Sequence, residues 1–309
     1  MVTAAAPRRR VLTVMARREE VEFFLFIAPW LIGFFAFVFG PFLASLYLGF
    51  TNYDGFHTPV WTGLKNYFKL TGDPLFWTSL RVTATYAMVS VPLHIIFGLS
   101  IAVILNQKVK GLAVWRTIYF LPSVVSGVAV AMLWLWILNP EFGLLNMGLR
   151  AVGIVGPKWV HSTTWALPAL IMMSLWGVGS TMVVYLAGLQ GIPTEFYEAA
   201  SIDGANAARR FISITLPLLS PVIFFMLVMG IIGSFQVFTQ AYIMTSGGPG
   251  NATLFYVLNL YRKGFLEYSM GYASALAWIL FLIIMGLTLL VFRSSRFWVY
   301  YESELTSAE

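Results

Sequence analysis

Residues 198–217 read EAASIDGANAARRFISITLP, a polar and charged segment between two long apolar runs. Its spacing is defined by Glu198, Ala199, Ala200, Gly204, Ile214, Leu216 and Pro217. Just upstream, Thr194 can cap a helix, and the carboxylate of Glu195 suits the positive end of that helix. Gly204 allows a turn with positive φ before a second short helix. The segment therefore predicts a compact helical peg, with apolar residues such as Ile202 available for contact with another protein.

The flanking runs belong to a chain that is 59% hydrophobic, 17% aromatic and 10% charged over its 309 residues. Soluble domains carry about 25% charged residues, so this composition indicates a membrane protein. A helix of about 20 apolar residues crosses the hydrocarbon core, and it satisfies its own backbone there. The runs that are long enough are Phe23–Phe50, Thr78–Leu105, Thr117–Leu138, Trp165–Ala187, Leu216–Thr245 and Gly271–Phe292. We therefore predict an all-α membrane protein with six transmembrane helices.

The distribution of Lys and Arg predicts how this bundle is oriented. With the N-terminus inside the cell, most of the 19 basic residues fall in cytoplasmic segments, in agreement with the positive-inside rule. We expect a multi-pass protein of the bacterial inner membrane with both termini in the cytoplasm. Its expected parts are a basic N-terminal tail, a six-helix transmembrane domain and a C-terminal tail, at residues 1–22, 23–295 and 296–309. The segment 188–217 then faces the cytoplasm.

Several other chemistries are not expected. The net charge of +6 is spread along the chain rather than gathered into one patch, so no nucleic-acid partner is expected. The chain has no Cys, and His57, His94 and His161 are scattered, so we expect no metal site. His94 lies within the second apolar run, where we interpret it as a hydrogen-bonding residue between helices; a proton relay is the alternative. No zinc motif and no GxSxG sequence occurs, so we expect no catalytic residue and no enzyme activity.

The spacing of residues 198–217 resembles the EAA loop of the membrane subunits of ATP-binding-cassette importers, with which such a permease docks on a separate ATPase. Three further segments, 120–126 (FLPSVVS), 134–136 (WLW) and 245–249 (TSGGP), are similar to the permease subunits of carbohydrate importers. The resemblance covers roughly residues 25–295 and implies a type I importer permease of the maltose and glycerol-phosphate kind. The chain lacks the additional N-terminal helices and the large external domain of the larger maltose permease.

This resemblance implies a larger assembly. Its other members are a second homologous permease subunit, two ATP-binding-cassette ATPase subunits and an extracytoplasmic solute-binding protein, with membrane lipid around them and a carbohydrate as substrate. No GxxxxGK[ST] phosphate loop occurs in this sequence, so ATP would be bound by partner subunits, and no cofactor is expected here. The residues implied in coupling to the ATPase are Glu198, Ala199, Ala200, Asp203, Gly204, Ile214, Leu216 and Pro217.

The apolar runs also suggest where a solute would pass. None of them carries Asp, Glu or Lys in its interior, which favours a neutral route. Sugars bind through aromatic faces and neutral hydrogen-bonding groups, and helical spacing places such residues on one face of the fourth run and one face of the fifth. The candidate substrate-pathway residues are Met173, Trp176, Gly177, Ser180, Gly230, Ser234, Gln236 and Phe238. The competing interpretation is that these small and polar residues only pack helices together.

Our main prediction is the permease subunit of an ATP-driven, binding-protein-dependent importer of mono- or oligosaccharides, forming half of the translocation pathway. A permease for glycerol-3-phosphate or a related polar solute is an alternative, although an anionic solute needs Arg or Lys in the route, which the partner permease would supply. An ion-coupled secondary carrier is a second alternative. It is disfavoured because such carriers need an ionisable group at depth in the membrane.

Overall fold

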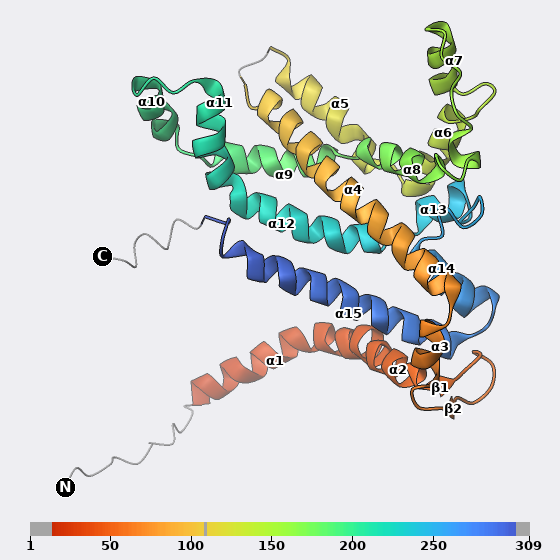
Figure 1. Cartoon of the computed structure of the whole chain (residues 1–309). Helices are drawn as coiled ribbons and strands as arrows, with labels where there is room; N and C mark the ends of the chain where they lie inside the picture. The colour runs from red at the N-terminus through yellow and green to blue at the C-terminus, as the bar shows by residue number, and fades with distance from the viewer. Residues whose placement is uncertain (1–13, 108–109, 301–309) are drawn as a thin grey trace.

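The computed structural model describes residues 14–107 and 110–300. This part of the chain is a bundle of long helices that run side by side (Figure 1). One short hairpin accompanies them among the described residues, in which β1 (Thr51–Asn52) pairs antiparallel with β2 (Val60–Trp61). Four helices are long and apolar enough to cross a membrane, or six if each bent pair counts as one span. The prediction of an all-α membrane protein with six spans is confirmed, with the hairpin added in a loop.

The first apolar run is a helix with a bulge rather than a regular helix. It consists of α1 (Val14–Phe34), the π-helical turn η1 (Phe35–Phe39) and α2 (Gly40–Gly49). Pro41 has no N–H to donate, and such a residue favours a local widening of the helix. The helix α2 packs on α15 (Met270–Ser295), where the indole Nε1 of Trp278 donates to Ser45 Oγ at 3.1 Å. The start of α1 lies within the predicted tail at 1–22, whose first thirteen residues lie outside the described residues.

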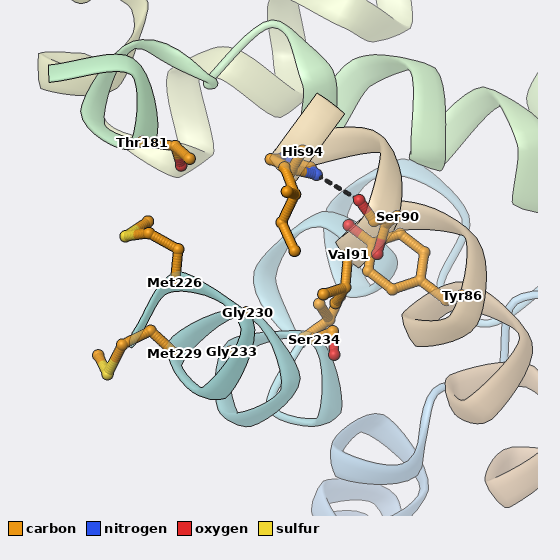
Figure 2. A pocket seen from close by; sticks show the side chains of 12 residues that line it. Tyr86, Ser90, Val91, His94, Thr181, Met226, Met229, Gly230, Gly233 and Ser234 are labelled. Atoms are coloured by element: carbon orange, nitrogen blue, oxygen red, sulfur yellow. Dashed lines mark hydrogen bonds between the residues drawn. The ribbon is translucent and has the colours of Figure 1, made fainter. Parts of the chain in front are cut away.

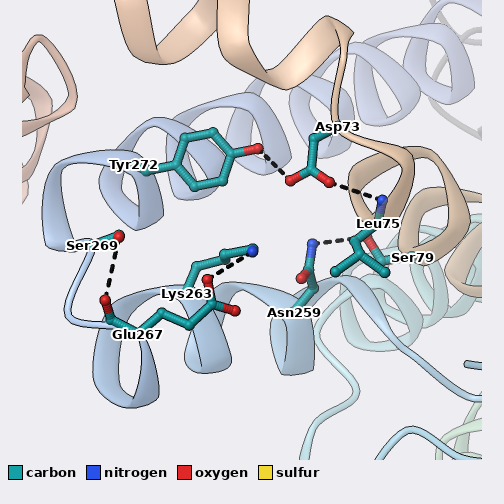
Figure 3. A network of polar contacts seen from close by, with 8 residues as sticks. All are labelled: Asp73, Leu75, Ser79, Asn259, Lys263, Glu267, Ser269 and Tyr272. Carbon is teal, nitrogen blue, oxygen red and sulfur yellow. Dashed lines mark hydrogen bonds and ion pairs between the residues drawn. The ribbon is translucent and has the colours of Figure 1, made fainter.

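The helix α4 (Pro74–Leu105) is the central element of the bundle, and the short α3 (Lys65–Thr71) precedes it. Its residues belong to all three apolar clusters of the core. The Asp73 carboxylate caps its first turn by accepting from the Leu75 N–H at 2.9 Å, and also accepts from the Tyr272 hydroxyl at 2.7 Å (Figure 3). At Gly98 a Cβ atom would lie 2.9 Å from Thr181 Cγ2, so this glycine lets α9 (Gly179–Gln190) approach α4 closely.

The third and fourth runs are each broken into two helices. The helices α5 (Leu112–Val124) and α6 (Gly127–Ile137) meet at 100°, and α8 (Ala166–Leu175) and α9 (Gly179–Gln190) meet at 45°. Pro122 in the last turn of α5 removes one helical donor, which weakens the helix where the chain turns. The fifth run also differs, because three residues separate the end of α12 (Leu216–Phe235) from the start of α13 (Thr239–Met244). The length of an apolar run indicates a membrane span, but it does not by itself show where the backbone bends.

The remaining elements lie at the two ends of the bundle (Figure 1). One end carries α10 (Thr194–Ile202), α11 (Ala207–Arg210) and the π-helical turn η3 (Phe211–Thr215), together with the start of α1 and the end of α15. The opposite end carries α7 (Leu144–Ala151), η2 (Trp159–His161), α14 (Tyr256–Tyr261) and η4 (Arg262–Leu266). The predicted C-terminal tail begins directly after α15, and its residues 301–309 lie outside the described part of the chain.

Candidate functional site: an exposed helical peg and an interhelical cavity

The segment with the EAA spacing forms a helical peg (residues 194–217) that projects from one end of the bundle (Figure 1). Its first helix, α10, begins at Thr194 with Pro193 at the capping position, so the prediction that Thr194 caps this helix is wrong by one residue. The helix ends in a turn at Gly204, whose φ is +77°. There the Gly204 N–H donates to Ser201 O at 3.1 Å and the Ala205 N–H to Ala200 O at 2.8 Å. This pair of bonds is a Schellman motif, which explains the glycine.

Side-chain hydrogen bonds fix the two halves of the peg to each other. The Asn206 side chain caps α11 by accepting from the Arg209 N–H at 2.9 Å. The Arg210 guanidinium donates to Ser201 Oγ at 2.7 Å, and so ties α11 to α10. The hydroxyls of Tyr197 and Thr215 are 3.0 Å apart, and Thr215 is buried. The peg is therefore held in one orientation relative to the start of α12.

The predicted coupling residues divide into two groups in this geometry. Those at the outer end of the peg are exposed apart from the half-buried Ala200: Glu198, Ala199, Asp203 and Gly204. The other three, Ile214, Leu216 and Pro217, are half-buried at the root of the peg, where Leu216 packs on the apolar cluster of α4 and α9. Beside the exposed group, the Ile202 side chain is 87% exposed, although it is apolar. No ion pair among the described residues includes Glu198.

A cavity of about 260 Å³ lies between α4, α9 and α12 (Figure 2). Its lining residues are Tyr86, Ser90, Val91, His94, Ile95, Thr181, Met226, Met229, Gly230, Gly233, Ser234 and Val237. None of them is Asp, Glu, Lys or Arg, so the lining combines apolar groups with hydroxyls, one phenol and one imidazole. Such a wall can bind a neutral polar solute through hydrogen bonds, and it offers no fixed counter-charge for an ionic one. Among the described residues, no group of His, Asp and Glu could hold a metal ion.

His94 connects this cavity to the break in the fourth span. Its ring Nδ1 lies 2.8 Å from Ser90 O on its own helix, and its Nε2 lies 3.0 Å from Ser174 O at the end of α8. The break after α8 leaves carbonyl groups without an α-helical partner, which is costly inside a membrane. A neutral imidazole carries one N–H and so donates to one of these two carbonyl oxygens at a time. The interpretation of His94 as an interhelical hydrogen-bonding residue is confirmed.

The structure brings only some of the predicted pathway residues together. Gly230 and Ser234 line the cavity, as does the neighbouring Val237, whereas Gln236 is exposed at the end of α12. Phe238 lies in the break after α12 and contacts other aromatic rings. That these residues bind the solute stays a prediction. Of the four predicted on the fifth run, only Gly230 and Ser234 line the cavity.

The residues predicted on one face of the fourth run do not share a helix. Met173 is buried in the core on α8, and Ser180 is exposed on α9. Trp176 and Gly177 lie in the turn between these helices. The continuous face from 173 to 180 is therefore wrong, because the span bends at 176–178.

Three polar residues of the cavity were missed by the sequence analysis. Tyr86 and Ser90 on α4 line it together with His94, and Thr181 contributes from α9. Tyr86, Ser90 and His94 are spaced by four residues, and residues four apart lie on one face of a helix. This spacing around the one histidine within a span was the signal that could have identified them.

The chain was compared with protein families, with individual proteins and with solved structures. Residues 94–298 match the family described as binding-protein-dependent transport system inner membrane component. The chain is 47% identical to the probable ABC transporter permease protein YesP of Bacillus subtilis, over 93% of this chain and 94% of that protein. It is 35% identical to the trehalose/maltose transport system permease protein MalF of Thermococcus litoralis, over 91% of this chain and 95% of that one.

A solved structure shares the fold. One chain of a bacterial alginate ABC transporter, in complex with alginate pentasaccharide-bound periplasmic protein, superposes with a TM-score of 0.80. The match covers 90% of this chain and 95% of that chain at 22% sequence identity. The fold is thus that of an ABC importer membrane subunit, and the chain belongs to the family of binding-protein-dependent transport system inner membrane components.

Proposed function

We propose that this chain is one of two permease subunits of an ATP-driven, binding-protein-dependent sugar importer in a bacterial inner membrane. The observation that carries the proposal is the peg, which exposes Glu198, Ala199 and Ile202 while its root is fixed to the bundle. An exposed carboxylate beside small and apolar residues suits a groove on another protein. In this proposal the peg lies in the cytoplasm, as do both termini, and it contacts one of two ATP-binding-cassette ATPases, which bind the ATP.

The rigidity of the peg supports a mechanical role. Its two helices are joined by the Schellman turn and by the Arg210–Ser201 hydrogen bond, and the Tyr197–Thr215 contact joins them to α12. A displacement of the peg by closure of the ATPase pair is therefore passed to α12, which lines the cavity. Movement of α12 relative to α4 changes the shape of the cavity, so that the solute site opens to one side of the membrane and then to the other.

Two observations support a sugar as the solute. Relatives include proteins named for trehalose and maltose, for lactose and for arabinooligosaccharide transport. The cavity presents hydroxyls, a phenol and an imidazole without a fixed charge, which suits a neutral polyhydroxyl ligand. A glycerol-3-phosphate route is less well supported, because the cavity lining has no Arg or Lys. A second permease subunit and an extracytoplasmic binding protein complete the proposed importer.

Isolation of the affinity-tagged chain from its native membrane tests this proposal. We expect an ATPase and a second permease to co-purify, and the complex in vesicles to take up maltose, trehalose or lactose only with ATP and the binding protein. Uptake of glycerol-3-phosphate in place of the sugars would favour the alternative permease. Uptake driven by a proton or sodium gradient, by this chain alone, would contradict the proposal.

A further inference from the structure

Four aromatic side chains form a continuous row at the end of the bundle opposite the peg. Phe238 stacks on Tyr242, with ring centroids 5.4 Å apart and ring planes inclined by 16°. Both contact Tyr261, at 5.1 and 5.6 Å. Tyr261 in turn stacks on Phe265 at 5.4 Å and 27°. The rings come from the break after α12, from α13, and from the adjoining α14 and η4, so the tertiary fold assembles the row from separate elements.

Along the chain, the aromatic row begins at the residue that follows the cavity lining. Val237 lines the cavity, and Phe238 is the next residue along the chain. Exposure increases from there outward: Phe238 and Tyr261 are half-buried, whereas Tyr242 is 43% exposed and Phe265 is 57% exposed. The row therefore leads from the neighbourhood of the cavity to the surface of the described chain.

Two simpler explanations account less well for the row. Aromatic pairs stabilise a protein core by packing, but a ring that serves only as core is not exposed over half of its surface, as Phe265 is. Aromatic residues that anchor a protein in lipid are spread around its perimeter at the depth of the headgroups. These four rings instead contact one another, because Phe238, Tyr242 and Tyr261 meet pairwise and Phe265 stacks on Tyr261. Gln236 and Gln240 each lie two residues from Phe238 in the sequence and supply neutral carboxamides to this segment.

We propose that Phe238, Tyr242, Tyr261 and Phe265 form a stacking subsite for carbohydrate rings, which guides the solute between the extracytoplasmic surface and the cavity. The inference rests on the proposed sugar import. The C–H face of a sugar ring packs on an aromatic face, while phenol and carboxamide groups bond its hydroxyls. Several weak sites in a row favour passage, because each binds the solute without retaining it.

The test uses the complete importer in vesicles, with its ATPases, second permease and binding protein. Maltose, trehalose and lactose are the probes, each supplied below saturation. Tyr242→Leu and Phe265→Leu remove a ring and keep apolar volume, whereas Tyr242→Phe and Phe265→Trp keep a ring. Phe68→Leu is the matched control, because Phe68 on α3 is 70% exposed at the same end and lies outside the row.

We expect each ring-removing variant to lower sugar uptake about fivefold, in line with the loss of one aromatic contact. Each ring-keeping variant should retain more uptake than the leucine variant at the same position, whereas Phe68→Leu should stay within about twofold of the wild type. ATP hydrolysis stimulated by the binding protein should be unchanged in all five, which shows that the complexes are folded and coupled.

Equal uptake by the ring-removing and ring-keeping variants would overturn the subsite. An equal loss in Phe68→Leu would overturn it in favour of a lipid-anchoring belt. A wild-type importer that takes up none of the three sugars would instead count against the proposed function itself, so the two failures are distinguishable.

Discussion

The peg and the cavity are built in different ways. The peg is held by bonds between residues close in the sequence: a Schellman turn, an asparagine cap and contacts over at most eighteen residues. The cavity is held by contacts between distant segments, such as His94 with Ser174, eighty residues apart. A locally determined element keeps its shape while it moves as a unit. A site made from distant helices changes shape when those helices shift, which is what a transport pathway needs.

The largest expected effect is on the turn of the peg. At Gly204 φ is +77°, where a residue with a side chain is strained by about 1–2 kcal/mol. Gly204→Val should change the direction of the peg and so weaken its coupling to the ATPase. A coupling free energy of about 1–3 kcal/mol corresponds to a change of roughly 5- to 150-fold in the coupled equilibrium. We therefore expect ATP-driven uptake to fall about tenfold or more. Uptake and ATP hydrolysis in vesicles measure this effect.

Gly204→Asn is the matched control, since asparagine tolerates the left-handed region better than other residues do. No atom of the described chain lies within 4 Å of a Cβ built at Gly204. The two variants therefore test backbone strain rather than a steric clash. Equal activity of the valine and asparagine variants would show that the conformation of this turn does not matter for coupling.

The next expected effect is on the packing around the cavity, and it concerns stability rather than uptake. Gly98→Leu places a side chain against Thr181 and Tyr185, and so pushes α9 away from α4. Overpacking of this kind costs about 1–3 kcal/mol, which should lower the thermal unfolding temperature in detergent. Gly286→Leu on α15 is the control, because no atom lies within 4 Å of its Cβ position. Similar melting of both variants would contradict the close approach of α4 and α9.

His94 offers a test of the contact across the broken span. His94→Leu leaves the carbonyl groups of Ser90 and Ser174 without the imidazole donor, which should cost about 1 kcal/mol in a membrane protein. His94→Gln keeps a donor that can reach one carbonyl. We expect thermal unfolding to rank the wild type above the glutamine variant and the leucine variant lowest. A leucine variant as stable as the wild type would show that this contact does not hold the break.

The smallest expected effect is local and depends on pH. In the exposed loop between β1 and β2, the Asp54 carboxylate accepts from the backbone N–H of His57 and Phe56 and contacts the His57 ring at 2.6 Å. The backbone N–H of His57 holds the pKa of Asp54 well below its ordinary 3.8. The hydrogen bond that the His57 ring donates to the Asp54 carboxylate raises the pKa of His57 above its ordinary 6.5.

The signs of these two shifts give the window in which the loop is most ordered. The contribution of Asp54 is present above pH 3.8 and is lost as the pH falls through its lowered pKa. That of His57 is fully present below pH 6.5 and is lost as the pH rises through its raised pKa. Amide exchange at Phe56 and His57 should therefore be slowest, after correction for intrinsic rates, between these values. Asp54→Asn should remove the dependence, and an unchanged profile in that variant would contradict the pairing.

The same contrast explains what the sequence could predict. The peg was predicted in outline because its signals are local: Gly204 for the turn, a polar first helix and the fixed spacing to Pro217. The six spans were predicted because long apolar runs reveal contact with lipid. The position of the helix start was wrong by one residue at Thr194, since Pro193 occupies the capping position.

The bend in the fourth run and the cavity could not be predicted from the sequence, for a physical reason. At the bend at 176–178, His94 of α4 contacts Ser174 O, and no residue near 176 in the sequence indicates that contact. A helical face drawn across the bend therefore joined Met173 to Ser180 wrongly. Ser234 and Gly230 were predicted correctly as neighbours, because α12 is regular over that stretch.

Chemical cross-linking tests the central claim most directly, since the chain has no native cysteine. With Ile202→Cys at the tip of the peg, we predict a cross-link to a cysteine in the ATPase groove and arrest of ATP-driven uptake, reversed by reduction. Phe68→Cys at the opposite end should give no such product. Glu198→Cys provides a second position for the same cross-link. If neither variant cross-links to an ATPase and ATP-driven uptake nevertheless persists, the proposed contact between the peg and the ATPase is contradicted.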